Sequence, residues 1–278
     1  MDISGYEMLD RVGEGPMTEI WRARHVALDR IVAIRFMKTE FADDLDEVRV
    51  FLDEGKRAAE IEHPNIVQVY DVGHADDRPY FIMEYVAGET VAQMLDKGKT
   101  FSQERALKIA ECVGSALATG WDKARIIHRN IKPGNVRIDD DGSIKLKYLG
   151  LSMRAVPGSA EPDRIEGTPN YMAPEQAEGR ALDCRADMYG LGATLYHMLT
   201  GHLPFGSSPP DEAMRKQIEE QLPHPRDWRP DLSHGIGVFL TKLMMKDPGD
   251  RYSDWPQALQ AMKAVSHGHI MVDRTSQP

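Results

Sequence analysis

Short apolar runs alternate with polar turns over the first third of the chain. They predict strands over residues 6–11, 19–24, 31–37, 67–72 and 80–86. Between the third and fourth runs, Val48, Phe51, Gly55 and Ala58 recur at the spacing of one helix face, which predicts a helix within residues 44–62. This part of the chain is therefore expected to be strand-rich, with a single helix.

Helical periodicity dominates the remainder of the chain. One apolar set follows Ser102, a suitable N-cap, and comprises Ala106, Ile109, Ala110, Val113 and Leu117. A second set ends at Gly201 and comprises Met188, Leu191, Leu195 and Leu199. Between the two sets, Asp141-Gly142 predicts a turn that joins strands over residues 136–138 and 144–146. The change from strands to helices is expected near residues 86–90.

Composition narrows the class of protein. The 278 residues are 41% hydrophobic and 28% charged, with a formal net charge of −10. No long Lys/Arg run is present, which argues against a nucleic-acid surface or an anionic membrane partner. Cys112 and Cys184 lack metal-ligand spacing, and neither a membrane span nor a signal pattern is evident, so a cytoplasmic setting is expected.

Several short motifs follow one another in order along the chain. They are Gly13-Glu14-Gly15, Val32-Ala33-Ile34-Arg35, His128-Arg129-Asn130 with Asn135, Ala173-Pro174-Glu175, Asp187 and Arg251. Their order and spacing resemble the protein kinase family. Lys132 and the Pro-Glu-Gln ending resemble its bacterial serine/threonine members. Each motif alone is a weak signal, but the ordered series leaves little room for chance.

The resemblance implies an α+β fold of two lobes. A small strand-rich N-terminal lobe would cover residues 1–86, a mainly helical large lobe residues 87–265, and a polar tail residues 266–278. It also implies structural roles for His128, Arg129 and Asp187. Glu175 and Arg251 would form an ion pair that holds the large lobe together.

Three positions depart from the family pattern. Arg35 stands where a Lys contacts the phosphates, Asn130 where an Asp accepts the substrate proton, and Tyr148 where an Asp holds magnesium. Arg is not a conservative replacement for Lys where the geometry is tight, an amide is not a base, and a phenol is a poor magnesium ligand. Three other residues of the family pattern, Glu54, Lys132 and Asn135, are retained in this chain.

The same resemblance outlines a nucleotide pocket. Its residues would be Gly13, Gly15, Ile20, Ala33, Arg35, Met83, Glu84, Val86, Arg137 and Lys147. An active member carries a Lys, a Glu and two Asp at the four key positions, a charge of −2. Here an Arg, a Glu and two neutral residues give 0, and Arg137 and Lys147 raise it to +2. Either cation could bind a ligand, or could pair with Glu54 or with nearby carbonyl groups.

These changes favour a kinase-like domain that does not transfer phosphate, a pseudokinase, which acts in signalling by binding a protein partner. Neither a metal nor a cofactor is expected. A first alternative is a switch that binds ATP without magnesium, and a second is a weak or noncanonical ATP-dependent transferase. Asn130 is expected to hold the backbone of its loop by hydrogen bonds, and Lys38 is not expected to replace Arg35.

Overall fold

The computed structural model describes residues 3–147, 153–155 and 166–268. These residues form two compact units. The first contains the chain up to Ala87 together with Lys147, and the second contains Gly88–Leu146 and the described residues from Met153 onward. Each unit is described by itself. Tyr148 and most of the tail over residues 266–278 lie outside the described residues.

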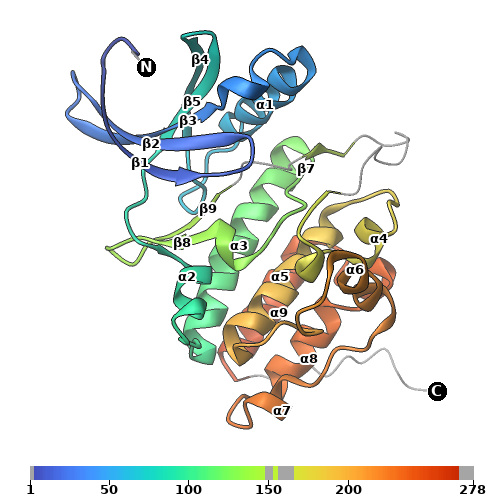
Figure 1. The fold of residues 1–278 in the computed structure, drawn as a ribbon. Coiled ribbons are helices and arrows are strands. Elements are labelled where there is room, and N and C mark those ends of the chain that lie inside the picture. Colours follow the sequence, from blue (N-terminus) through green and yellow to red (C-terminus); the bar gives the residue numbers. More distant parts are fainter. Residues whose placement is uncertain (1–2, 148–152, 156–165, 269–278) are drawn as a thin grey trace. The chain divides into compact units, whose positions relative to one another are not determined.

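The first unit is a five-stranded antiparallel sheet with one long helix (Figure 1). The strand order is β1-β2-β3-β5-β4, with the bounds β1 Tyr6–Glu14, β2 Thr18–His25, β3 Arg30–Met37, β4 Val69–Ala75 and β5 Arg78–Glu84. Helix α1, Leu45–Ala59, follows a short 3-10 turn, Thr39–Phe41. The expected strand-rich first unit with a single long helix is confirmed.

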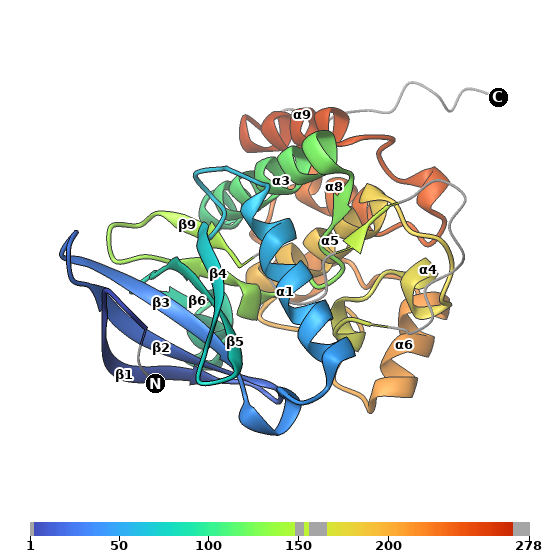
Figure 2. The same ribbon diagram turned by 90° about the horizontal axis from the view of Figure 1, so that it is seen from above.

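Two apolar clusters form on the two faces of this sheet. Phe51 and Ala58 of α1 pack against Phe81 and Met83 of β5. Both views show α1 beside β4 and β5 (Figure 2). A second cluster around Ile34 is formed by the residues that alternate with these along the strands, as strand geometry requires. Helix α1 begins at Asp44, whose carboxylate accepts the backbone N–H groups of Asp46 and Glu47.

The hairpin of β4 and β5 differs from the sequence prediction. Strands were expected over residues 67–72 and 80–86, whereas they span Val69–Ala75 and Arg78–Glu84. A two-residue turn sets the register, because Asp76 and Asp77 both have positive φ, 50° and 57°. The apolar pattern did not reveal this turn, since Asp-Asp without Gly is a weak turn signal.

The second unit is mainly helical. Its helices are α2 Val91–Asp96, α3 Gln103–Ala124, α4 Pro174–Ala177, α5 Cys184–Thr200, α6 Pro210–Glu219, α7 Pro225–Trp228, α8 His234–Leu243 and α9 Trp255–Ser266. Short strands accompany them: β6 Glu89–Thr90, β7 Ile126–Ile127, β8 Val136–Ile138, β9 Ile144–Leu146 and β10 Met153–Arg154. Single 3-10 turns cover Pro133–Asn135, Pro169–Tyr171 and Pro248–Asp250. No helix among the described residues is long and apolar enough to cross a membrane.

The core of this unit lies around α5. Helix α3 packs on both α5 and α9, and both views place α3 beside α9 (Figures 1 and 2). The predicted ends are confirmed: the Ser102 hydroxyl accepts the N–H of Arg105, and α5 ends at Gly201 with φ 75°. The predicted turn at Asp141-Gly142 joins β8 to β9, with φ 85° at Gly142.

Candidate functional site

Arg35 is held firmly inside the first unit. It lies on β3, and its Nη1 donates to Oε1 of Glu54 on α1 at 2.6 Å. The two side chains are only 13% and 6% exposed. The Arg35 side chain therefore faces α1. Lys38 pairs with Glu14 at 2.8 Å, so it does not take the place of Arg35.

A second hydrogen bond joins Arg35 to the turn that follows β1. Arg35 Nε donates to the hydroxyl of the buried Thr18 at 3.1 Å, and Thr18 O accepts the N–H of Gly15 at 2.7 Å. The guanidinium also lies near the rings of Phe51 and Phe81, 5.6 and 5.4 Å from their centroids. Through Thr18, the first residue of β2, Arg35 therefore links the turn over residues 15–17 to β3. No sequence signal had indicated this role for Thr18.

Replacing Arg35 by Lys tests this arrangement. A Lys keeps the positive charge near Glu54, but its single ammonium group cannot bond both Glu54 and Thr18 as the two guanidinium nitrogens do. The free energy of unfolding should therefore fall by about 1–2 kcal/mol. The matched control is Arg22→Lys, since Arg22 pairs with Asp10 on an exposed face and should lose less than about 0.5 kcal/mol. Urea unfolding measures both. Equal losses would show that Arg35 has no special structural role.

The apolar residues predicted to contact a nucleotide base gather on neighbouring strands of the first unit. Gly13 pairs with Ile20 across β1 and β2, and Ala33 pairs with Met83 across β3 and β5. Ala33, Met83 and Val86 are buried in the same cluster, against which Ile20 packs. Two further residues predicted for the pocket make polar contacts. The Glu84 carboxylate accepts the backbone N–H of Gln68, and the backbone N–H of Gly15 donates to the Thr18 carbonyl oxygen in the turn after β1.

The loop from His128 to Asn135 is anchored to α5 in the second unit. Asp187, fully buried, accepts the backbone N–H groups of His128 and Arg129 at 2.8 and 2.9 Å. Arg129 has φ 63°, a conformation that L residues rarely adopt, so these two bonds hold a strained backbone. Burial raises the pKa of Asp187 to about 7, and the two N–H donors only partly offset this rise.

Asn130 lies in a closed network of hydrogen bonds. Its Oδ1 accepts the hydroxyl of Thr168 at 2.8 Å, and the same hydroxyl accepts a bond from Nζ of Lys132 at 2.7 Å. Nδ2 of Asn135 donates to the Asn130 carbonyl oxygen at 2.7 Å. Burial lowers the pKa of Lys132. Asn130, Lys132 and Asn135 are thus brought together, and Thr168 joins them although its sequence position suggested no site role.

Arg129 forms an ion pair that the motifs did not predict. Its Nη2 lies 2.6 Å from Oε2 of Glu166, and Gln176 donates to the backbone oxygens of both Arg129 and Glu166. A carboxylate of the chain itself therefore neutralises Arg129. No motif signals this pair, because the two residues are far apart in sequence and neither the position nor the type of Glu166 belongs to a recognised pattern.

The pair makes a testable prediction. Glu166→Gln removes the charge but keeps the shape, so it should cost about 1 kcal/mol and increase amide exchange at Gly167 and Thr168. Glu178→Gln is the matched control, since Glu178 pairs with Arg180 on an exposed surface. Hydrogen exchange measures the difference. Unchanged exchange at Gly167 and Thr168 would contradict a role of Glu166 in holding this segment.

Glu175 and Arg251 form the predicted ion pair. Both nitrogens of the Arg251 fork reach the carboxylate, at 2.6 and 2.7 Å, and the Arg251 side chain is fully buried. Arg251 also donates to the backbone oxygens of Met245, Arg185 and Lys246. The architectural pairing expected from the sequence is confirmed.

Arg137 uses its guanidinium inside the second unit. Its Nη1 donates to the carbonyl oxygen of Gly88 at 2.6 Å, which is one of the two outcomes left open by the sequence. Lys147 belongs to the first unit and also has an interaction partner. The charge of Arg137 is thus already engaged by the protein.

The described residues of the loop from His128 to Asn135 offer amide groups, not carboxylates, to a metal ion. Asn130 and Asn135 offer neutral amides, and the amide nitrogen of Asn135 is already bonded to Asn130. Among the described residues, no three His, Cys, Asp or Glu side chains are grouped as metal ligands would be. Magnesium prefers carboxylate and phosphate oxygens. The donor groups of Asn130 and Asn135 therefore suit hydrogen bonding within the loop better than the binding of a divalent cation.

A family model and several curated proteins are similar to this chain. Residues 6–269 match the family described as the protein kinase domain. A probable serine/threonine-protein kinase of Clostridium perfringens, CPE1738, is 36% identical over 248 residues, and the serine/threonine-protein kinase PrkC of Bacillus subtilis is 34% identical over 252 residues. These alignments cover 89% and 90% of this chain but only 36% and 39% of the relatives. The chain therefore spans well under half the length of these relatives.

A solved structure is similar to this chain in fold. The kinase domain of Mycobacterium tuberculosis PknI is similar with a TM-score of 0.73 and 26% sequence identity. The match covers 95% of this chain and 97% of that domain.

Proposed function

The chain belongs to the protein kinase family as a domain of the bacterial serine/threonine type, and from this premise we propose that it has lost phosphoryl transfer and acts as a binding module in signalling. Its fold is the protein kinase fold. Its conformation and surfaces, rather than a chemical step, would carry the signal. A signalling domain can work in this way when a partner prefers one of its conformations.

The proposal depends chiefly on Asn130, an amide that is held by hydrogen bonds in an intact loop. The loop around it is fully assembled: Thr168, Lys132 and Asn135 bond to it or to its neighbours at 2.7–2.8 Å. The amide at this position cannot take a proton from a substrate hydroxyl. Losing a positioned base typically lowers a rate by about 10²- to 10⁴-fold. The architecture of the loop is thus kept while the group that would do the chemistry is missing.

Arg35 supports the same proposal from the first unit. Its guanidinium is bonded to Glu54 and Thr18 and packed near two phenylalanine rings. A phosphate would have to share a planar group of which two nitrogens, Nε and Nη1, already bond Thr18 and Glu54. Arg35 therefore fits a structural role better than the phosphate contact of the family's Lys.

Phosphate transfer is the test of this proposal. The chain is incubated with ATP and either magnesium or manganese, alone and with a generic protein substrate, and intact masses are recorded. No mass increase on either protein is expected. The proposal fails if phosphate is transferred and Lys132→Ala abolishes the transfer while Lys38→Ala does not. An adduct other than phosphate would instead indicate a noncanonical transferase.

Nucleotide binding without metal is the competing function. It would use Arg35 and Arg137. Arg35 pairs with Glu54 as the family's Lys pairs with its Glu, but the Arg137 guanidinium is already bonded to the Gly88 carbonyl. We therefore rank it below the binding module, and we expect no cofactor. A titration with a fluorescent ATP analogue in chelator decides the matter: saturable binding that weakens in Arg137→Ala would favour the switch.

A further inference from the structure

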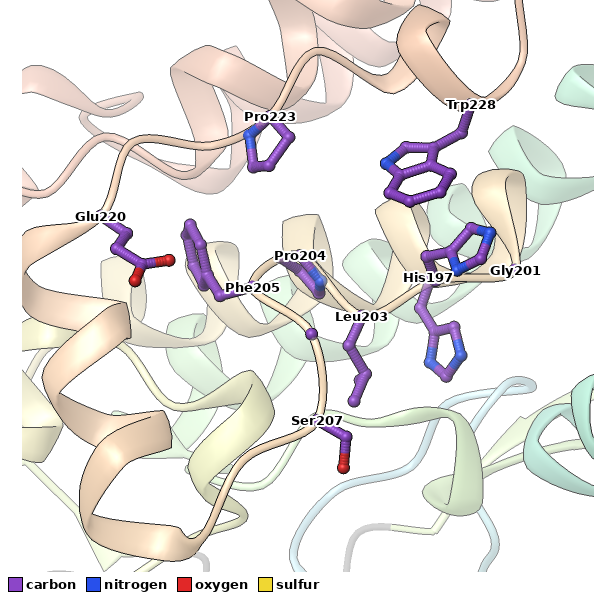
Figure 3. A pocket seen from close by; sticks show the side chains of 11 residues that line it. His197, Gly201, Leu203, Pro204, Phe205, Ser207, Glu220, Pro223 and Trp228 are labelled. Carbon is purple, nitrogen blue, oxygen red and sulfur yellow. The ribbon is translucent and has the colours of Figure 1, made fainter.

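A pocket of about 560 Å³ lies in the second unit, and none of the residues of the Asn130 network lines it (Figure 3). One wall is the loop between α5 and α6, with Leu203, Pro204 and Phe205, and the other is the segment that carries Pro223 and Trp228. Figure 3 shows Glu220 and Trp228 at opposite ends, with Phe205 and Pro204 between them. We call this the α5–α6 pocket. Its volume and its mixture of apolar walls with one carboxylate are typical of a ligand site.

The wall formed by the α5–α6 loop is fixed by hydrogen bonds. The Thr200 hydroxyl accepts the N–H of His202 at 3.0 Å, and Lys216 donates to Ser208 at 2.9 Å and to the Phe205 oxygen at 3.5 Å. The ammonium group of Lys246 lies 4.3 Å from the centroid of the Phe205 ring. A pocket whose wall is held in advance costs less conformational entropy when a ligand binds.

Trp228 supplies a large apolar surface at one end of the pocket. It is 51% exposed, and its ring stacks on the His202 ring with centroids 3.9 Å apart. This stacking fixes the indole without covering it. Exposed tryptophans held in this way are frequent energetic centres of protein interfaces.

Glu220 supplies a charge at the other end. Its carboxylate forms no ion pair with any residue that the structure describes, and the nearby cations Lys246 and Arg215 interact with it only through space. Two glutamates of α6 differ, since Glu219 pairs with Arg215 at 2.7 Å and Glu212 with Lys216 at 3.3 Å. Residues 207–231 carry six acidic and four basic side chains, so this surface favours a cationic partner.

We propose that the α5–α6 pocket docks an extended segment of a partner protein, with a basic side chain at Glu220 and an apolar side chain against Trp228. A peptide suits the pocket better than a single small cation, because Figure 3 shows the carboxylate and the indole at opposite ends, so one ligand must reach both. The inference rests on the proposed role as a binding module, to which it adds the chemistry of the partner.

A short peptide can test this pairing. The probe is the acetylated, amidated peptide arginine-proline-alanine-leucine, compared with versions in which citrulline replaces arginine or serine replaces leucine. The readout is the indole N–H signal of Trp228 in NMR spectra, assigned with Trp228→Phe. A saturable shift is expected. Citrulline or Glu220→Gln should each weaken binding by about threefold to fivefold, and the two together no further.

Asp211→Asn is the matched control, because Asp211 is an exposed carboxylate of α6 that does not line the pocket. It should leave the affinity unchanged. The proposal is overturned by no saturable shift of the Trp228 signal, by equal affinity for the citrulline peptide, or by free arginine binding as tightly as the peptide. A shift that depends on protein concentration without any peptide would assign the pocket to a second copy and also overturn it. None of these outcomes bears on phosphate transfer, which the mass measurement decides separately.

Discussion

Replacing Arg251 by Met is expected to destabilise the second unit by about 3–5 kcal/mol. The substitution leaves the buried Glu175 carboxylate without its partner, and it removes three further bonds from Arg251 to backbone oxygens. A buried charge that loses its partner carries the full cost of its lost hydration. The variant is therefore expected to unfold at much lower urea concentration or to accumulate poorly.

The matched control is Arg185→Met. Arg185 pairs with Asp183 near the surface, where both side chains are about a third exposed, so the loss should stay below about 1 kcal/mol. A double variant, Glu175→Leu with Arg251→Met, should recover part of the loss because no unpaired charge remains. If Arg251→Met loses no more stability than Arg185→Met, the ion pair does not hold this unit together.

Replacing Asp187 by Ala is the second large effect, with an expected loss of about 2–5 kcal/mol. The change leaves the N–H groups of His128 and Arg129 buried without acceptors and releases the positive φ of Arg129. The loop that carries Asn130 should then lose its fixed shape. Asp183→Ala removes the N-cap of the same helix and a surface pair with Arg185, and should cost about 1–2 kcal/mol.

The pH dependence of stability tests the same residue. Burial raises the pKa of Asp187 to about 7 in the folded protein, above the value of about 4 in the unfolded chain. The folded state therefore binds the proton more tightly, and the contribution of this carboxyl group falls as pH rises from about 4 to about 7. Urea unfolding should show wild type losing stability relative to Asp187→Asn across this range. A constant difference would mean that the folded protein does not raise this pKa.

Local sequence signals predicted much of the fold. Ser102 and Gly201 fix helix ends through one side-chain bond and one backbone angle, so neighbouring residues suffice to locate them. The Glu175–Arg251 pair followed from the family resemblance, as did the grouping of Asn130, Lys132 and Asn135.

Contacts between distant residues could not be predicted in the same way. The Thr18–Arg35 and Arg129–Glu166 bonds join residues 17 and 37 positions apart, and no local preference encodes such a meeting. The β4–β5 register depends on positive φ at both Asp76 and Asp77, which Asp tolerates but which an Asp-Asp pair does not by itself predict. The α5–α6 pocket arises from two segments that each carry no recognisable motif. Tyr148 lies outside the described residues, so its predicted role stays a prediction.

We propose that this kinase-family domain no longer binds ATP and magnesium in the way that phosphoryl transfer requires. Thermal unfolding with ATP tests it most directly, in parallel samples with magnesium and with chelator. A ligand at about 100 times its Kd stabilises a protein by about 2.7 kcal/mol, which raises the unfolding midpoint measurably. We expect no rise in the midpoint that depends on magnesium. A rise that appears with magnesium and disappears in chelator would contradict the claim.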